Sequence, residues 1–489
     1  MSRRRVVTEA EGRGRSPRAS WLTAAAVARA TAGQVLARGR TATGVTTDTR
    51  GDCAGKLFVA LRGPSHDGHD HVATAVAKGA AGLLVSRPQH ELVGLDRTAA
   101  PFVVRVEDTG KALLDLAAEH RRRHRAHVVG ITGSCGKTST KEWLGAVLAA
   151  AMPTVRSPGS FNNQIGVPLT LFAIGPETRA AVVEIGTNAP GEIELLTAVA
   201  RPEIGIVTCV APAHLQGLGS LQGVAREKSM LIAGLPEHGL AILNGDDAAC
   251  REMAALTAAK VQFTSVTREA DWFATDLRFH ALGTTFLLQG QRPVTLPRLG
   301  THVVYNALAV IAAAHRLGVA EDDVLQALAT VPSAARRMEP KVVAGVTIFD
   351  DTYNMNPQSA AAGLQALAGL GGGGRRIVVF GEMLELGDAS ESLHRGLGAE
   401  VQRTRQDQLV VVGAGAGPIA DGAVAAGMPA ANVHRTTDAD AAFLLLRSLL
   451  RAGDRVLCKA SRRVALDRLV DRLVGELPVA PMARAEENA

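Results

Sequence analysis

Residues 127–141 read HVVGITGSCGKTSTK, and this stretch decides the fold. An apolar run typical of a buried strand (His127–Ile131) leads into a glycine-rich turn, and a helix is expected from about Ser139 to Ala150. Glycines let backbone N–H groups converge on an anion, the helix N-terminus adds positive partial charge, and Lys137 adds a full charge. The sequence therefore predicts a phosphate-binding loop between a strand and a helix.

The loop is a shortened form of the pattern G-x-x-x-x-G-K-[ST], because Ile131 stands where that pattern has its first glycine. It still ends in Gly-Lys-Thr, and the Thr138 hydroxyl can hold Mg²⁺. The loop by itself therefore predicts a phosphate ligand together with Mg²⁺, and ATP is the nucleotide we expect for the whole chain. The predicted ATP-binding residues of the loop are Gly133, Ser134, Cys135, Gly136, Lys137, Thr138 and Ser139.

The remainder of the chain alternates short apolar runs with Ala-rich stretches, which is typical of parallel sheets covered by helices on both faces. A length of 489 residues suggests about three domains. We predict an α/β protein with a small N-terminal α/β domain, a central doubly wound parallel sheet that carries the phosphate loop, and a C-terminal Rossmann-like sheet. The expected ranges are 1–18 (disordered basic extension), 19–106, 107–333 and 334–480 (the three domains), and 481–489 (loose tail).

Composition narrows the class of protein. The net charge of +6 leaves nucleic-acid binding open, but aromatic residues make up only 3% of the chain, which disfavours base-stacking surfaces. Five scattered cysteines without a CxxC motif indicate a reducing compartment. The N-terminus lacks the apolar core of a secretory signal, and no apolar run reaches the ~18–20 residues that span a bilayer. We expect a cytoplasmic monomer that neither binds nucleic acid nor inserts into a membrane.

Further polar residues follow the predicted strands of the central domain. Glu184 ends one apolar run, and His214 comes shortly after another. Ligands of open parallel sheets bind at the carboxyl ends of the strands, so both residues are candidates for a Mg²⁺ site beside the phosphate loop. The adjacent amides Asn162 and Asn163 indicate polar substrate binding, or simply a loop.

Two segments of the third domain deserve separate interpretation. Asp350 and Asp351 follow a predicted strand and could serve ribose hydroxyls or a metal, although a plain turn is about equally consistent with the composition. The run VGAGAG at 412–417 does not fit G-x-G-x-x-G, so we assign it a structural role.

Taken together, these segments resemble the Mur ligase family, in order from about residue 19 to residue 475. The resemblance rests on TDTR at 47–50, the phosphate loop at 131–138, EIGTN at 184–188, AREK at 225–228, DDTYN at 350–354 and GEMLELG at 381–387. It implies an ATP-dependent ligase whose acid substrate is activated as an acyl-phosphate. Two of the segments match members that join UDP-N-acetylmuramoyl-tripeptide (UDP-MurNAc-tripeptide) to D-alanyl-D-alanine (D-Ala-D-Ala).

The resemblance also implies roles for individual residues. Lys137, His214 and Lys228 are implied as catalytic, and Lys228 matches a lysine that the family carbamylates; a free Lys228 that pairs with phosphate is the alternative. The implied metal ligands are Thr138, Glu184, His214 and carbamylated Lys228. The implied nucleotide contacts outside the loop are Asn306 for adenine, Asp351 for ribose, and Arg337. The implied substrate-binding residues are Thr47, Asp48, Thr49, Arg50, Asn162, Asn163, Asn354 and Asn356.

Three alternatives stay open at this point. A ligase of the same family could use a different amine or acyl substrate. A kinase or regulatory NTPase with the same loop would release ADP without forming an amide, and it would not need the TDTR and DDTYN segments. An inactive binding module is disfavoured because Lys137, Thr138, Glu184, His214 and Lys228 are all present.

Overall fold

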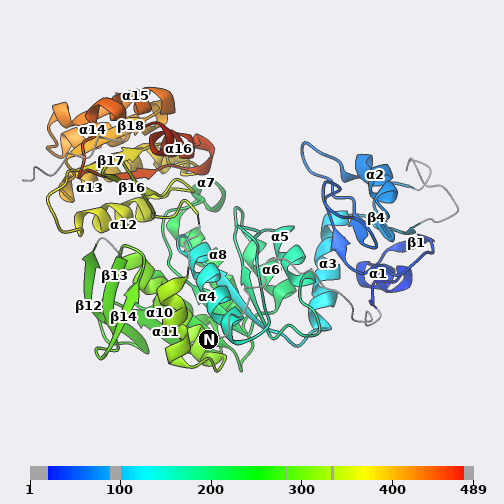
Figure 1. The fold of residues 1–489 in the computed structure, drawn as a ribbon. Helices are drawn as coiled ribbons and strands as arrows, with labels where there is room; N and C mark the ends of the chain where they lie inside the picture. The colour runs from blue at the N-terminus through cyan, green and yellow to red at the C-terminus, as the bar shows by residue number, and fades with distance from the viewer. Residues whose placement is uncertain (1–19, 89–100, 281–282, 332–334, 478–489) are drawn as a thin grey trace, which may run out of the picture. The chain divides into compact units, whose positions relative to one another are not determined.

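The computed structural model describes residues 20–88, 101–280, 283–331 and 335–477 (Figure 1). The expected extension at 1–18 and the expected tail at 481–489 lie outside these residues. The chain divides into two compact units, Met1–Arg123 and His124–Ala489. Among the described residues, no helix combines the length and the apolar composition needed to cross a membrane.

The first unit is a small α/β layer built on one sheet. Its strand order is β1-β5-β4-β3-β2, with β1 antiparallel to β5 and the other neighbours parallel. The strands are β1 (Gln34–Ala37), β2 (Val45–Thr46), β3 (Leu57–Val59), β4 (Gly82–Val85) and β5 (Phe102–Arg105), and the helices are α1 (Ala24–Thr31), α2 (Val72–Ala77) and α3 (Thr109–Arg122). Asp108 begins α3 by accepting hydrogen bonds from two backbone N–H groups of its first turn. The expected small α/β domain is therefore confirmed.

The second unit begins with a large sheet in the order β14-β13-β12-β11-β10-β9-β6-β8-β7. In this order, each neighbouring pair from β12 through β7 is parallel. The pairs β12–β13 and β13–β14 are antiparallel. The strands are β6 (His127–Thr132), β7 (Thr154–Arg156), β8 (Ala180–Glu184), β9 (Ile204–Val207), β10 (Leu240–Asn244), β11 (Lys260–Ser265), β12 (Trp272–His280), β13 (Gly283–Leu288) and β14 (Arg292–Leu296). The sequence predicted the parallel part of this sheet but not the antiparallel extension.

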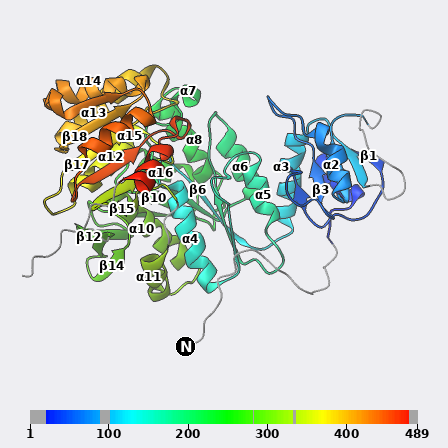
Figure 2. The same ribbon diagram turned by 45° about the horizontal axis from the view of Figure 1, so that its top comes forward.

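Helices cover both faces of this sheet (Figure 2). Apolar side chains of α4, α10 and α11 pack on one face, and those of α8 and α9 on the other. The helices are α4 (Lys137–Ala151), α5 (Gly166–Phe172), α6 (Glu192–Ala200), α7 (Leu215–Leu218), α8 (Leu221–Ala233), α9 (Ala248–Glu252), α10 (Thr301–Arg316) and α11 (Glu321–Thr330). Burial on both faces explains why the strands are continuously apolar.

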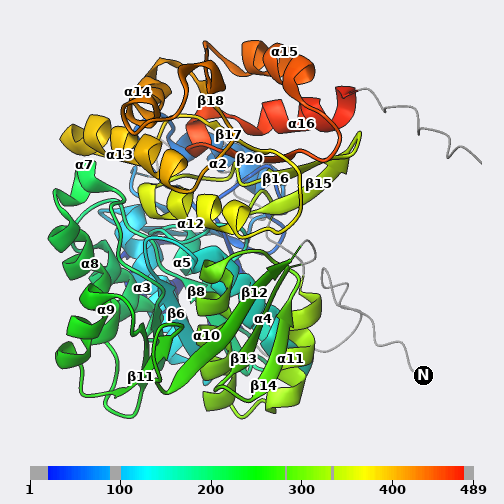
Figure 3. The same ribbon diagram turned by 90° about the vertical axis from the view of Figure 1, so that its left-hand side faces the viewer.

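A separate sheet follows in the same unit, in the order β15-β16-β20-β17-β18-β19, with only β15 antiparallel to its neighbour. Helices α12, α13 and α14 pack on one face and α15 and α16 on the other (Figure 3). The elements are β15 (Glu339–Val343), β16 (Val346–Asp350), α12 (Pro357–Ala368), β17 (Arg376–Phe380), α13 (Ser390–Arg403), β18 (Gln408–Val412), α14 (Gly417–Ala425), β19 (Val433–Thr436), α15 (Ala439–Leu449), β20 (Arg455–Lys459) and α16 (Asp467–Glu476). This arrangement confirms the expected Rossmann-like C-terminal layer.

Candidate nucleotide and ligation site

The predicted phosphate loop joins β6 to α4. Gly133 and Gly136 have φ angles of 143° and 84°, a region of backbone conformation that side chains disfavour. Gly136 precedes the first residue of α4, so the free N–H groups of that helix face the loop. The Lys137 ammonium donates to the Gly133 carbonyl at 2.6 Å. The loop therefore offers the converging donors that the sequence predicted.

The segment after β9 supports the loop from one side. Ser134 exchanges two hydrogen bonds with the backbone of Ala211, each of 2.9 Å, and Thr208 donates to the Cys135 carbonyl. A Cβ atom on Gly133 would collide with the Thr208 side chain. The glycine is therefore required for both its conformation and this close approach.

A cavity of about 680 Å³ opens beside the loop. Residues from the central sheet and from the C-terminal sheet line it together. The predicted residues among them are Ser134, Cys135, Gly136, Lys137, Thr138, Ser139, Asn162, Asn163, Glu184, His214, Lys228, Asn306, Arg337, Asp351, Asn354 and Asn356. Segments more than 200 residues apart in sequence thus contribute to one site.

Glu184 ends β8 inside the cavity with only 1% of its surface exposed. Its Oε1 atom accepts a 2.8 Å hydrogen bond from Asn162 Nδ2, while its Oε2 atom is buried without a protein partner. The loop that carries Asn162 is fixed by Lys141, whose buried ammonium donates to the carbonyls of Ser157 and Gly159 at 2.8 and 2.6 Å. Because a buried carboxylate oxygen is costly to leave without a partner, the free Oε2 points to a cationic ligand.

The surroundings lower the pKa values of two nitrogen groups in the cavity, those of Lys228 and His214. Burial, reinforced by the nearby Lys137 ammonium, lowers the pKa of Lys228 to about 7. Burial and Lys137 also lower the pKa of His214, against the opposing effect of Glu385. His214 Nδ1 lies 2.8 Å from a carboxylate oxygen of Glu385, which comes from the C-terminal sheet. The Glu227 carboxylate accepts N–H groups at the start of α6, and its charge only partly offsets the lowering of the Lys228 pKa.

Arg337, which lies just before β15, contacts the residues of the phosphate loop. Arg337 donates to the Thr138 hydroxyl at 3.0 Å, and its guanidinium lies 4.3 Å from the centre of the Tyr353 ring. Arg337 was predicted on the nucleotide side, and this contact places it at the end of the loop. The Tyr353 ring fixes the guanidinium through a cation–π contact.

The two adjacent carboxylates of the third domain have different surroundings. Asp350 is fully buried, where it accepts hydrogen bonds from Lys341 and Thr352. Asp351 lines the cavity and forms a 2.6 Å ion pair with Lys459. Packing therefore places only the second of these two acids on the cavity, a distinction that the composition of the segment does not give.

The predicted asparagines occupy varied positions. Asn306 is buried on α10, and its Oδ1 atom packs against Gly136. Asn163 accepts N–H groups at the start of α5. Asn354 lines the cavity, and its carbonyl accepts from Lys459. Asn356 begins α12 as its N-cap and contacts the phosphate loop through the Cys135 thiol. Their roles toward adenine and substrate stay predictions.

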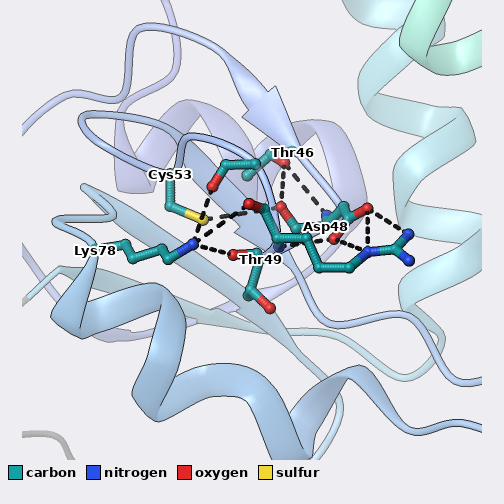
Figure 4. Close-up of polar contacts among 7 residues, drawn as sticks. Thr46, Asp48, Thr49, Cys53 and Lys78 are labelled. Carbon is teal, nitrogen blue, oxygen red and sulfur yellow. Dashed lines mark hydrogen bonds and ion pairs between the residues drawn. The ribbon is translucent and has the colours of Figure 1, made fainter.

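The TDTR segment lies in the first unit (Figure 4). Asp48 binds the side chain and the backbone N–H of Arg50, and these hydrogen bonds lower the pKa of Asp48 to about 2. The Lys78 ammonium donates to the Thr49 carbonyl at 2.7 Å. Thr46, just before the segment, donates to the Asp48 carbonyl at 3.2 Å. The segment is thus a folded turn whose Arg50 side chain stays largely exposed.

Comparison with known proteins identifies the family. Three family models match the chain: "Mur ligase family, catalytic domain" at residues 41–121, "Mur ligase middle domain" at 131–314, and "Mur ligase, glutamate ligase domain" at 336–462. The UDP-N-acetylmuramoyl-tripeptide--D-alanyl-D-alanine ligase of Escherichia coli K12 is 37% identical over 88% of this chain and 93% of its own length. The chain belongs to the Mur ligase family. The Mycobacterium tuberculosis H37Rv ligase of the same name is 38% identical, covering 88% and 92% of the two chains.

Solved structures of this family share the fold. MurF from Acinetobacter baumannii matches with a TM-score of 0.84 and 31% identity, over 93% of this chain and 99% of that one. MurF from Thermotoga maritima, solved in complex with ADP, matches with a TM-score of 0.78 and 26% identity, over 88% and 97%. The predicted fold and family membership are both confirmed.

Several residues of this Mur ligase site were not predicted. Lys141 lies only four positions after Lys137, but nothing in the sequence assigns it to the 157–159 carbonyls. Glu385 lies within the quoted GEMLELG segment, yet its contact with His214 joins residues 171 positions apart. Lys459, the last residue of β20, fixes Asp351. These residues position the predicted groups, and only the folded chain reveals their partners.

Proposed function

We propose that this Mur ligase joins the free carboxylate of UDP-MurNAc-tripeptide to the amine of D-Ala-D-Ala, with conversion of ATP to ADP and phosphate. The observation that carries the proposal is the cavity: it unites the phosphate loop with the DDTYN segment, in a chain 37% identical to a ligase of that name. A kinase or regulatory NTPase needs no acceptor segments of this kind beside its loop. The function follows from the family and from this shared cavity together.

The phosphate loop binds the phosphate end of the nucleotide in this proposal. Its N–H groups and the Lys137 ammonium bind the phosphates of ATP and neutralise charge that develops as the γ-phosphoryl group moves to the tripeptide carboxylate. The product of that step is an acyl-phosphate. The amine of the dipeptide then attacks the activated carbon, and phosphate leaves as the amide bond forms. Asn306, Arg337 and Asp351 are proposed to orient the rest of the nucleotide.

Mg²⁺ fits the oxygen donors of this cavity. The unpartnered Oε2 of Glu184 and the Thr138 hydroxyl both line it, and hard oxygen ligands suit Mg²⁺. Within the described ranges, no three His, Cys, Asp or Glu residues cluster as a self-sufficient metal site. This is compatible with Mg²⁺, which is usually held by one or two carboxylates, phosphates and water. When bound, the ion would neutralise phosphoryl charge; His214 is proposed as a further ligand.

Lys228 is proposed to carry a carbamate. A pKa of about 7 leaves a large neutral fraction of its amine at physiological pH, and a neutral amine can add to carbon dioxide with loss of one proton. The carbamate would replace a positive charge beside Lys137 with oxygen ligands for the metal. A Lys228 that stays free and pairs with phosphate is the alternative, and the mass of the intact protein distinguishes the two.

The remaining proposals concern the role of each domain, the substrate-binding residues, and the cellular location and oligomeric state of the protein. Residues 19–106 are proposed to bind the UDP-sugar through Thr47–Arg50, residues 107–333 to bind ATP, and residues 334–480 to receive the dipeptide. Asn162, Asn163, Asn354 and Asn356 are proposed to contact the substrates. A cytoplasmic monomer without a nucleic-acid partner fits the free cysteines and the scarcity of aromatic residues.

The test combines product analysis with a loop variant. The wild type with ATP, UDP-MurNAc-tripeptide and D-Ala-D-Ala should give a product whose mass corresponds to the pentapeptide. Lys137→Ala should lower turnover by about 10³–10⁵-fold without loss of the folded state, because it removes the cation on the transferred phosphoryl group. Lys111→Ala, on the exposed face of α3, is the matched control and should keep full turnover. Near-normal turnover in Lys137→Ala, or ADP release without an amide product, would overturn the proposal.

A further inference from the structure

Two cysteines lie in contact at the phosphate loop. Cys135 is in the loop itself, and Cys209 lies just after β9, the strand beside β6. The Ser134 N–H donates to the Cys209 carbonyl at 2.9 Å, and the Cys209 sulfur lies 3.7 Å from the Cys135 carbonyl oxygen. The two cysteines therefore lie on neighbouring backbone segments in direct contact, and both line the cavity.

From this geometry we propose that Cys135 and Cys209 are a thiol–disulfide modification site, at which oxidation closes a disulfide and impairs nucleotide binding. The site lies in the nucleotide-binding cavity, so the effect on ligation rests on the proposed function. The disulfide itself and the loss of nucleotide affinity do not depend on which amide the enzyme forms.

The surroundings assign different roles to the two thiols. The neighbouring Cys209 lowers the pKa of Cys135 against the effect of its own burial, and the Lys137 ammonium acts in the same direction as Cys209. The position of Cys135 just before the N-terminus of α4 also favours the thiolate. The Cys135–Cys209 contact and burial both raise the pKa of Cys209. Cys135 is therefore the thiol that reacts first, and Cys209 is the one that resolves the product.

The oxidant is a peroxide. The Cys135 thiolate attacks one peroxide oxygen, the O–O bond breaks, and hydroxide leaves; with hydrogen peroxide this gives Cys135 sulfenic acid. The Cys209 sulfur then attacks the Cys135 sulfur, the S–S bond forms, and the S–O bond breaks. The thiol proton of Cys209 and the sulfenic hydroxyl leave together as water. A dithiol reductant reverses the reaction by thiol–disulfide exchange.

Closure of the disulfide would rearrange the loop. In the reduced chain the Cys135 thiol donates to Asn356 Oδ1 at 3.2 Å, which connects the loop to the start of α12. In the disulfide this sulfur is bonded to Cys209, so that the connection is lost and the loop is tied to the segment after β9. The backbone at Cys135 can then no longer adjust to the phosphates. Bound nucleotide, in turn, should cover Cys135 and slow its oxidation.

The experiment uses the full chain. The reduced protein is exposed to hydrogen peroxide, blocked with N-ethylmaleimide and digested with trypsin without reduction. Cys135 is the only cysteine in the tryptic peptide 126–137, and Cys209 is the only one in 180–226, because Pro202 prevents cleavage after Arg201. We expect these two peptides to be cross-linked, the Kd for ADP to rise about tenfold, and dithiothreitol to restore both. ADP present during oxidation should slow the cross-link.

Two variants make the outcome decisive. Cys209→Ser should give no cross-link, and its Cys135 should proceed to sulfinic acid, which dithiothreitol does not reverse. Cys250→Ala is the matched control: this cysteine is buried on α9 outside the cavity, and its loss should leave the cross-link intact. The proposal is overturned if wild-type Cys135 is oxidised without the 126–137 to 180–226 cross-link, if Cys209 pairs with Cys250 instead, or if the disulfide forms without weakening ADP binding.

Discussion

Asn162 holds the carboxylate that is proposed to bind Mg²⁺, and replacing Asn162 by alanine tests that proposal directly. Asn162 Nδ2 donates to Glu184 Oε1 at 2.8 Å and leaves Oε2 of the same carboxylate without a hydrogen-bond partner. In Asn162→Ala the buried Glu184 carboxylate is free to turn. We therefore expect weaker Mg²⁺ binding without loss of the nucleotide loop.

The size of the effect follows from the single hydrogen bond that is lost. A hydrogen bond to a charged group contributes about 1.5–3 kcal/mol, and each 1.4 kcal/mol changes an equilibrium constant about tenfold. Removal of a partner that orients a metal ligand likewise costs about 10–100-fold in affinity or activity. The half-saturating Mg²⁺ concentration of Asn162→Ala should therefore rise about 10–100-fold.

The assay is the initial rate of phosphate release as a function of Mg²⁺, with ATP and both acceptor substrates saturating. Asn163→Ala is the matched control, because Asn163 binds the N–H groups of Ile165 and Gly166 and makes no hydrogen bond to Glu184. It should lose about 1 kcal/mol of stability and keep the wild-type Mg²⁺ dependence. An unchanged Mg²⁺ dependence in Asn162→Ala, with a raised KM for the tripeptide substrate, would refute the reasoning and make Asn162 a substrate contact.

Two further predictions concern stability. Lys141→Met should lower the free energy of unfolding by about 3–5 kcal/mol, measured with urea, because it removes a fully buried cation from Glu142 and from two carbonyls; a loss below about 1 kcal/mol would contradict this. Burial raises the pKa of Asp246, but hydrogen bonds from Thr267, Val266, Tyr305 and Ser265 outweigh it and lower the pKa to about 2. The folded-state pKa lies below the unfolded value of about 3.9, so this stabilisation is present above about pH 4 and lost as the pH falls through about 2. The difference in melting temperature between wild type and Asp246→Asn should therefore shrink over that range, and a constant difference would show that the carboxylate does not contribute.

Much of the fold could be predicted because its strands follow one rule. A strand buried on both faces is a continuous apolar run, and β6, β8, β9 and β10 all obey it. The sequence did not predict the β12–β14 extension because its strands mix buried, half-buried and exposed positions, as β12 does. Antiparallel pairing of such strands depends on which face the neighbouring helices cover, and the sequence does not state that.

The candidate site was predictable to the extent that its residues follow strands or belong to the loop. Glu184 and His214 could be assigned to the loop's cavity because strand ends share one edge of the sheet. The partners that orient them could not, since Glu385 reaches His214 from another sheet. Asp350 and Asp351 are chemically identical in the sequence; both are buried beside a lysine in the fold, and only Asp351 lines the cavity.

The central claim is that ATP activates the tripeptide carboxylate for attack by the dipeptide amine. The most direct measurement labels both oxygens of that carboxylate with oxygen-18 and follows the label into the products by mass spectrometry. Transfer to an acyl-phosphate and attack at carbon predict one labelled oxygen in each inorganic phosphate released and one retained in the amide. Phosphate released without label, or ADP formed with no amide product, would contradict the account.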